Sequence, residues 1–495
     1  MKGTILLATA AAALASVAVF ENGALTDIAS TESSQVDASL PQLPKTVPAD
    51  KGVGTVSTYA FPSVGKVTLY QPKGPPKGAV IFLSGDGGWN PGVMNMARRI
   101  AGQGAVVAGV STPAFLKSLE GDSSKCINPN FALRALAQDI QHRAGMRSYV
   151  HPILGGYSSG ATVAFATLAQ SPANIWRGVV SMGFGPDQAG QKPWCAAPGF
   201  TATRISKPEH GWWFDAKTIS SPWFVLQGMQ DQVVDAVVAR NFVAKYANAR
   251  LFELPKVGHG FGVEANWMPQ FQQIFVALMD SGPATTVAAD PGLPVTLVAD
   301  ASAPKSSTMA VMYSGDGGWA DLDANVASTL AARGIPVVGI DSLRYFWTAR
   351  SPQGIGQDLG QLIAHWSNKL GRPNVMVLGY SFGADAAPFA VAHLPPAERK
   401  QVVRLGLLGL SSNADMQFHL SNWLDYSGPQ SLPTIPAIKA LKPMSMVCIR
   451  GSDEDDNACP SIPSGLARQV VLPGGHHYNG RGDLIADAFT AGMTM

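Results

Sequence analysis

The six residues SGDGGW occur twice in the chain, at 84–89 and at 314–319. Each copy directly follows a short apolar run that is typical of a buried parallel strand, GAVIFL at 78–83 and TMAVMY at 308–313. A glycine-rich turn at the end of such a strand lets the main chain approach a neighbouring group closely. The same motif in the same context at two places indicates that one fold is present twice.

Further matching segments support this duplication. Ser158 corresponds to Ser381, 223 residues further along the chain (381 minus 158). Gly228 and Gly451 have the same separation (451 minus 228). A constant spacing between separate motifs is typical of a duplicated domain. The matching segments are 153–166 with 377–390, 226–234 with 449–457, and 256–261 with 473–478.

Between these motifs, apolar runs that suit buried strands alternate with helix-like segments. This alternation predicts an α/β fold in which a mostly parallel sheet is flanked by helices. We place the two domains at 51–280 and 295–495, joined by a linker at 281–294 that is rich in proline, glycine and small residues. Ahead of them, an apolar run after Lys2 predicts a signal peptide at 1–20, with an uncleaved anchor helix as the alternative. A disordered spacer is expected at 21–50.

Charge and cysteine content narrow the function further. The formal net charge is only +2 and no basic stretch is present, so nucleic-acid binding is not expected.

Export would permit disulfides. If the two halves are separate domains, the natural pairs are Cys126 with Cys195 and Cys448 with Cys459. Four free buried thiols are the alternative.

The second half carries the pattern of a nucleophilic serine. Ser381 lies in GYSFG at 379–383, between a strand-like and a helix-like run, which is the context that G-x-S-x-G requires. A serine hydroxyl needs a base, and an acid to orient that base. His476 is the candidate base because it corresponds to His259 in the first half. Together with His477 it would alternatively bind a metal, although no further ligand has metal-binding spacing.

The acid of this site is predicted in GSDEDDN at 451–457. Alignment on the glycine favours Glu454, and its neighbours Asp453, Asp455 and Asp456 stay open as alternatives because an insertion or bulge would bring one of them forward. The oxyanion of the reaction needs two donors, and the main-chain N–H groups of Phe382 and Asp316 are the candidates. For the loop around Asp316, an ordinary glycine turn with a packed tryptophan is the alternative.

The first half contains the same set of residues. Ser158, Asp231 and His259 are predicted to form a second active site, unless this copy has lost its activity. Thr162 stands where the second half has Asp385. If only one site works, we expect it to be the one at Ser381.

The motifs GYSFGAD, SGDGGW, DSLRYFW and LPGGHHY of residues 295–495 resemble the VirJ/AcvB family of bacterial periplasmic proteins. The first half fits the longer AcvB-like members, which carry an additional domain. The resemblance implies tandem α/β-hydrolase-like domains, a periplasmic location, and hydrolysis of aminoacyl-phosphatidylglycerol, a lipid esterified with lysine or alanine. It places the nucleophile at Ser381 and the histidine in the pair His476–His477. No metal or organic cofactor is implied.

Such a substrate would be an aminoacylated phospholipid at the membrane surface. Its ammonium group suits the carboxylate of Asp316 or Asp385, and its phosphate suits Arg344 or Arg350. Asp385 is equally explained as a carboxylate favoured in the first turn of a helix. Two other functions remain open. One is a general esterase or thioesterase, and the other is a non-catalytic periplasmic protein that contacts secretion-system proteins.

Overall fold

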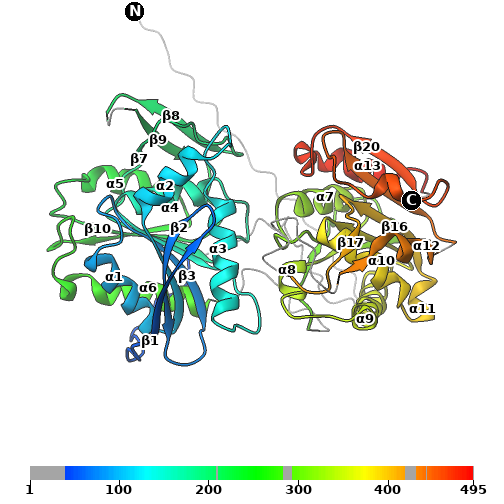
Figure 1. The fold of residues 1–495 in the computed structure, drawn as a ribbon, viewed down its shortest axis with the longest axis horizontal. Coiled ribbons are helices and arrows are strands. Elements are labelled where there is room, and N and C mark those ends of the chain that lie inside the picture. The colour runs from blue at the N-terminus through cyan, green and yellow to red at the C-terminus, as the bar shows by residue number, and fades with distance from the viewer. Residues whose placement is uncertain (1–39, 208–209, 282–291, 419–430, 442, 494–495) are drawn as a thin grey trace, which may run out of the picture. The chain divides into compact units, whose positions relative to one another are not determined.

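Two central β-sheets, one from each half of the chain, organise the computed structural model (Figure 1). The predicted signal peptide, most of the predicted spacer and most of the predicted linker lie outside the described residues. No helix among the described residues combines the length and apolar character needed to cross a membrane. The described residues are 40–207, 210–281, 292–418, 431–441 and 443–493.

The first sheet has eight strands in the order β1-β2-β4-β3-β5-β6-β10-β11. The pairs β1–β2 and β2–β4 are antiparallel, and every other neighbouring pair is parallel. The strands are β1 (Val53–Phe61), β2 (Gly65–Pro72), β3 (Gly78–Leu83), β4 (Ala105–Val110), β5 (Ile153–Tyr157), β6 (Gly178–Met182), β10 (Trp223–Gly228) and β11 (Ala249–Leu254). The helices are α1 (Pro91–Gly102), α2 (Thr112–Gly121), α3 (Asn130–Arg143), α4 (Ser159–Ala169), α5 (Ala236–Val243) and α6 (Met268–Asp280), with a 3-10 turn η1 (Glu264–Asn266).

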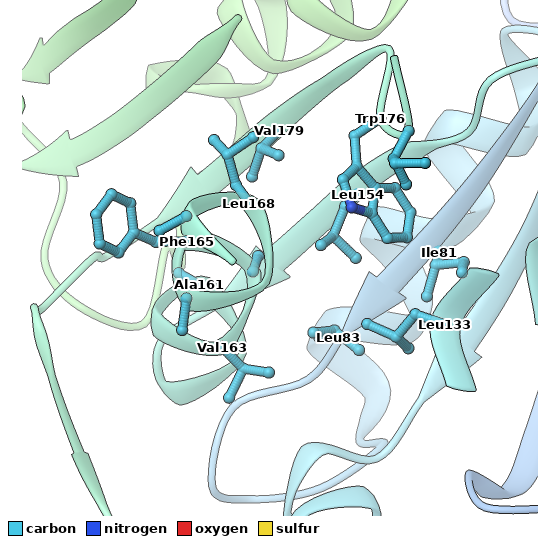
Figure 2. Close-up of a cluster of buried hydrophobic side chains, with 14 of the residues drawn as sticks. Ile81, Leu83, Leu133, Leu154, Ala161, Val163, Phe165, Leu168, Trp176 and Val179 are labelled. Atoms are coloured by element: carbon cyan, nitrogen blue, oxygen red, sulfur yellow. The ribbon is translucent and has the colours of Figure 1, made fainter. Parts of the chain in front are cut away.

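Helices cover both faces of this sheet. Because side chains alternate between the two faces of a strand, each central strand packs against helices on both sides. Ile81 and Leu83 of β3 pack with α3 and α4, as Figure 2 shows. Val80 and Phe82 of the same strand pack on the other face with α1 and α6. Since both faces are covered, all six residues of β3 are buried, and the strand reads as a continuous apolar run in the sequence.

The second sheet repeats this arrangement in the order β12-β14-β13-β15-β16-β19-β20. Position by position it matches β2-β4-β3-β5-β6-β10-β11, which is the strand order of the α/β-hydrolase fold. The predicted fold class of tandem α/β-hydrolase-like domains is therefore confirmed. The strands are β12 (Val295–Val298), β13 (Thr308–Tyr313), β14 (Val337–Ile340), β15 (Asn374–Tyr380), β16 (Val402–Leu408), β19 (Met446–Gly451) and β20 (Arg468–Leu472). The helices are α7 (Asp321–Ala332), α8 (Ser342–Tyr345), α9 (Pro352–Leu370), α10 (Phe382–Ala392), α11 (Pro396–Arg399), α12 (Thr434–Lys439) and α13 (Gly482–Thr490), with 3-10 turns η3 (Cys459–Ser461) and η4 (Tyr478–Gly480).

The halves differ between their fifth and sixth matched strands. Between β6 and β10, the first half inserts a small antiparallel sheet in the order β7-β9-β8. Between β16 and β19, the second half has a two-stranded pair, β17 with β18, and then α12. The inserted strands are β7 (Asp187–Ala189), β8 (Phe200–Ile205), β9 (Gly211–Ala216), β17 (Asn413–Ala414) and β18 (Leu432–Pro433).

Both predicted disulfides are present, and each lies within one half of the chain. Cys126 bonds Cys195, and this disulfide connects the approach to α3 with the segment between β7 and β8. Cys448 bonds Cys459 across 11 residues, and this disulfide brackets the acidic loop after β19. The alternative of free thiols is therefore wrong.

Part of the predicted spacer packs against the first half. Residues 40–50 were expected to belong to a disordered spacer, but Leu40, Leu43 and Val47 pack against the core of the first half. The carbonyl of Pro44 also accepts a hydrogen bond from the side chain of Gln273 (3.0 Å). Spaced apolar residues within this proline-containing segment were the signal that marked it as anchored.

Candidate active sites

Both predicted nucleophiles lie at a sharp turn between a strand and a helix. Ser158 separates β5 from α4, and Ser381 separates β15 from α10. Their φ angles are 54° and 52°, in a region that residues other than glycine rarely occupy. Such a conformation costs about 1–3 kcal/mol and persists only where the surrounding structure enforces it.

The glycines of G-x-S-x-G explain how the turn is enforced. A Cβ atom at Gly383 would lie closer than 3.0 Å to the carbonyl oxygens of Tyr313 and Ser314. A Cβ atom at Gly379 would likewise collide with the carbonyl of Gly383. The start of the helix therefore approaches two strands more closely than any side chain permits. In the first half, Gly156 and Gly160 meet the corresponding main-chain atoms.

In the second half, the structure brings Ser381, His476 and Glu454 together. Ser381 Oγ lies 2.9 Å from His476 Nε2, and His476 Nδ1 lies 2.5 Å from Glu454 Oε1. Glu454 Oε2 accepts hydrogen bonds from the main-chain N–H of Gly451 (2.9 Å) and from the hydroxyl of Tyr478 (3.3 Å). Of the four carboxylates at 453–456, Glu454 thus occupies the position beside the histidine.

The neighbours of these residues point elsewhere. Asp455 is exposed to solvent, so it is not the carboxylate that meets the histidine. His477 is also exposed, and its Nδ1 lies 3.0 Å from the hydroxyl of Tyr380. The two histidines therefore face different partners.

Glu454 is held in its charged form. Burial by itself would raise the pKa of Glu454, but hydrogen bonds from His476 and from the Gly451 N–H outweigh burial and leave this pKa below its ordinary value. A charged carboxylate on Nδ1 fixes the tautomer that leaves Nε2 free to accept the serine proton.

The first half contains an equally complete set. Ser158 Oγ lies 2.9 Å from His259 Nε2, and His259 Nδ1 lies 2.8 Å from Asp231 Oδ2. The Asp231 side chain has no exposed surface. Its oxygens also accept hydrogen bonds from the main-chain N–H groups of Val233 and Val234 (both 2.9 Å) and from the amide of Gln227 (3.1 Å).

In both halves, the serine of SGDGGW ties this loop to the start of the helix that follows the neighbouring strand, α2 or α8. The Ser314 hydroxyl donates to the carbonyl of the following residue (3.1 Å) and accepts from the N–H of Ser342 (2.9 Å). The Ser84 hydroxyl makes the matching bonds, at 2.9 Å and, with the N–H of Thr112, at 3.0 Å. The sequence showed the repeat of this serine but not its role as an anchor.

The tryptophan of the motif is packed against a glycine of the neighbouring strand. A Cβ atom at Gly339 would collide with the ring of Trp319, and one at Gly109 would collide with the ring of Trp89. The packed tryptophan that we weighed as an alternative is thus present, and it does not conflict with an oxyanion role. The motif lies beside the nucleophile, because a Cβ atom at Gly315 would stand 3.7 Å from Ser381 Cβ. That the N–H groups of Asp316 and Phe382 bind an oxyanion remains a prediction.

Asp385, proposed to receive the substrate ammonium, is buried. Its Oδ1 accepts a hydrogen bond from the N–H of Ser411 (2.7 Å), and burial raises the pKa of Asp385 well above its ordinary value. Thr162 has the same task in the first half, where its hydroxyl donates to the carbonyl of Gly185 (2.7 Å). This favours a role for Asp385 in fixing the first turn of α10 to the loop after β16.

The two arginine candidates differ in their surroundings. The guanidinium of Arg350 lies over the ring of Tyr345 (4.4 Å) and 3.7 Å from the carboxylate of Asp358. Arg344 lies in the short helix α8, is half-buried, and donates its main-chain N–H to Asp341 (3.1 Å). Because Arg350 already has partners, Arg344 is the better candidate for a phosphate.

Sequence reasoning missed a buried carboxylate next to the second SGDGGW loop. Asp323, in the first turn of α7, is only 3% exposed, and its Oδ1 has no hydrogen-bond partner among the described residues. Burial raises the pKa of Asp323 well above its ordinary value. The corresponding residue in the first half is Val93 (323 minus 230), which lies in the apolar core. Comparing the two copies letter by letter past the tryptophan would have revealed this substitution.

Comparison with known proteins identifies the second half. Residues 307–495 match the family model described as bacterial virulence protein (VirJ). This segment is a VirJ domain. The predicted family is thus confirmed for the second half. No curated protein matches the chain.

Solved structures similar to the chain each cover less than half of it. The dienelactone hydrolase from Anabaena variabilis is 18% identical over 46% of this chain and 98% of its own, with a TM-score of 0.31. A serine hydrolase without a lid from Xanthomonas campestris is 18% identical over 49% and 100%, with a TM-score of 0.30. Est1E from Butyrivibrio proteoclasticus is 11% identical over 46% and 99%, also at 0.30.

Proposed function

We propose that the VirJ domain is a serine hydrolase that cleaves the aminoacyl ester of aminoacyl-phosphatidylglycerol. The observation that carries the proposal is the line of Ser381, His476 and Glu454, joined at 2.9 and 2.5 Å on a strained strand-to-helix turn. A hydroxyl, an imidazole and a carboxylate in this order are the components of nucleophilic acyl transfer. The resemblance to the VirJ/AcvB family supports the choice of ester.

In the proposed reaction, Ser381 Oγ attacks the aminoacyl carbonyl while His476 Nε2 takes the serine proton. The charged Glu454 stabilises the imidazolium that forms. The N–H groups of Phe382 and Asp316 would bind the oxyanion. The histidine then returns the proton to the departing glycerol oxygen, and water releases the amino acid from the enzyme. The products are phosphatidylglycerol and a free amino acid.

Charges around the site suit a substrate with both an ammonium and a phosphate group. Asp453, Asp455 and Asp456 are exposed on the loop that also carries Glu454. Exposed carboxylates at the mouth of a site raise the local concentration of a cation. Arg344 offers a guanidinium to the phosphate.

We also propose a periplasmic location. Two disulfides fit a protein that is exported to an oxidising compartment. The membrane leaflet that faces this compartment would present the lipid substrate.

The test uses the purified full chain with vesicles that contain lysyl- or alanyl-phosphatidylglycerol. We expect release of the amino acid by the native chain, a loss of at least about 10⁴-fold in Ser381→Ala, and no change in the control Ser461→Ala, whose side chain is exposed. A fluorophosphonate probe, with the labelled peptide mapped, reports whether Ser381 is reactive.

The outcomes separate the rival functions. Labelling of Ser381 with turnover of simple esters but none of the lipid would replace our proposal with a general esterase. No labelling of Ser381 in a folded chain would leave only the non-catalytic interaction protein.

A further inference from the structure

The triad of the first half is assembled as fully as that of the second. Ser158 keeps the left-handed φ of a nucleophile, and its hydroxyl is within hydrogen-bonding distance of His259. Asp231 is held by four hydrogen bonds. The His259 side chain is 18% exposed, so the site is open to a reactant. Strain and a fully buried carboxylate are costly features, and an inactive copy has no need to retain them.

We propose that Ser158, His259 and Asp231 form a second active site, and that this site hydrolyses esters whose acyl chain is uncharged and apolar. The acyl class follows from the surroundings of the triad, because the triad itself is shared by both halves. Two differences between the halves carry this inference: the side chains on the loop that carries the acid, and the residue at the position of Arg344.

The loop that carries the acid exposes large apolar side chains in the first half, beside the polar Gln230, Gln232 and Asp235. Where the second half exposes aspartates beside Glu454, the first half exposes Met229 and Val233 beside Asp231. Five of the nine large hydrophobic side chains found exposed among the described residues lie in this loop, in α5, or four residues after His259. We call these five the apolar rim. They are Met229 (37% exposed), Val233 (72%), Val237 (50%), Val238 (38%) and Val263 (61%).

Exposed apolar side chains on the segments that carry the acid and follow the histidine suit an alkyl chain. Single exposed apolar residues are normal, but five on these short segments, out of nine among the described residues, indicate a contact site. Val233 donates its N–H group to the acid itself, so this residue of the apolar rim adjoins the triad directly.

The guanidinium expected to bind the phosphate of a phospholipid headgroup is missing here. The position of Arg344 is occupied by Ala114 (344 minus 230), which has no charge for a phosphate. The aspartate of SGDGGW is common to both halves and does not distinguish them. The two sites therefore differ in the charge of what they admit, and not in the bond that they break.

The reaction balances with water as the only co-substrate. Ser158 Oγ forms a bond to the acyl carbon while its proton moves to His259 Nε2. The bond from the acyl carbon to the alcohol oxygen breaks, and the alcohol leaves with that proton. Water then attacks the acyl-enzyme, gives one proton to His259, and releases a carboxylic acid as the proton returns to Ser158.

The test compares Ser158→Ala, Ser381→Ala and the double variant of the full chain. The substrates are 4-nitrophenyl octanoate and lysine methyl ester. We expect Ser158→Ala to lower kcat/KM for the octanoate at least about 100-fold and to leave the lysine ester unaffected, with the reverse in Ser381→Ala. Fluorophosphonate labelling of Ser381→Ala should map to Ser158. Octanoate turnover that survives in Ser158→Ala, or a folded Ser381→Ala chain without label at Ser158, would overturn the second site.

A separate pair of variants tests the acyl class. Val233→Asp places a charge in the apolar rim, and Val56→Asp places one on the exposed, 47% accessible valine of the edge strand β1 as a control. We expect KM for the octanoate to rise about 5-fold or more in Val233→Asp, with kcat nearly unchanged, and no change in Val56→Asp. Equal kinetics of the two variants would contradict the apolar acyl class while leaving the second site standing. Because these assays do not use the lipid, they fail or succeed independently of the function proposed for the VirJ domain.

Discussion

The two triads reach the same geometry through different acids. Asp231 is short, fully buried, and fixed by two N–H groups of its own loop. Glu454 is one methylene longer and is fixed from β19 and from Tyr478, and its partner His476 is more exposed than His259 (38% against 18%). The position of the carboxylate is thus constrained, whereas the residue that supplies it and the charge around it are free to differ.

The largest effect is expected from removing the charge of each acid. Glu454→Gln and Asp231→Asn keep the shape of the side chain but no longer stabilise the imidazolium or fix its tautomer, so kcat at the affected site should fall roughly 10³–10⁴-fold. The measurement is kcat/KM on lysine methyl ester for Glu454→Gln and on 4-nitrophenyl octanoate for Asp231→Asn. If Asp455→Asn lost this much activity and Glu454→Gln did not, the assignment of the acid would be wrong.

The elbow glycines should behave alike in both halves. Gly160→Ala and Gly383→Ala each place a methyl group against main-chain carbonyls that have little room to move, so we expect about 3 kcal/mol of destabilisation or a displaced serine. Gly121→Ala is the control, because a Cβ atom there meets nothing within 4 Å. The measurement is the urea midpoint of unfolding for each variant. If only one of the two elbow substitutions lowered this midpoint, the two elbows would not be equivalent.

Asp323 should make the stability of the second half depend on pH in a way that Val93 cannot. Because burial raises the pKa of Asp323 in the folded state, its contribution to stability is complete below the ordinary aspartate pKa and is lost as the pH rises through the folded pKa. Asp323→Asn should therefore raise the free energy of unfolding by roughly 1–2 kcal/mol at pH 7.5 and change it little below pH ~4. Unfolding curves of Asp323→Asn at both pH values test this. An equal stabilisation at both pH values would contradict the claim that ionisation of Asp323 destabilises the fold.

The smallest effect is expected from the exposed charges. Asp455→Asn combined with Asp456→Asn should raise KM for lysine methyl ester about 2- to 5-fold at low salt, with the difference disappearing in 0.5 M salt because exposed charges are screened. Hydrolysis of an uncharged ester at Ser381 is the control and should not change. An effect that persisted at high salt would indicate a direct contact and not attraction at a distance.

Much of this architecture could be predicted from the repeat alone. Buried parallel strands are continuous apolar runs, so β3 and β13 were recognised within their bounds. The disulfide pairs followed from keeping each half separate. The inserted sheet β7-β9-β8 was missed, because the second copy has no counterpart that would mark it. The choice of Glu454 over Asp455 rested on one alignment position, since neighbouring carboxylates look alike until a loop conformation turns one inward. The buried site of Asp385 could not be foreseen either, because its partner Ser411 is 26 residues away.

The pairing of tryptophan with a facing glycine has a consequence for anyone who transplants SGDGGW into another scaffold. In both halves the glycine lies 20 residues after the tryptophan (109 minus 89, and 339 minus 319) on the adjacent strand. The hexapeptide is therefore only part of a larger unit. In a recipient that has a side chain at the facing position, the indole ring would not fit. The grafted hexapeptide would keep its sequence, but its loop would be displaced.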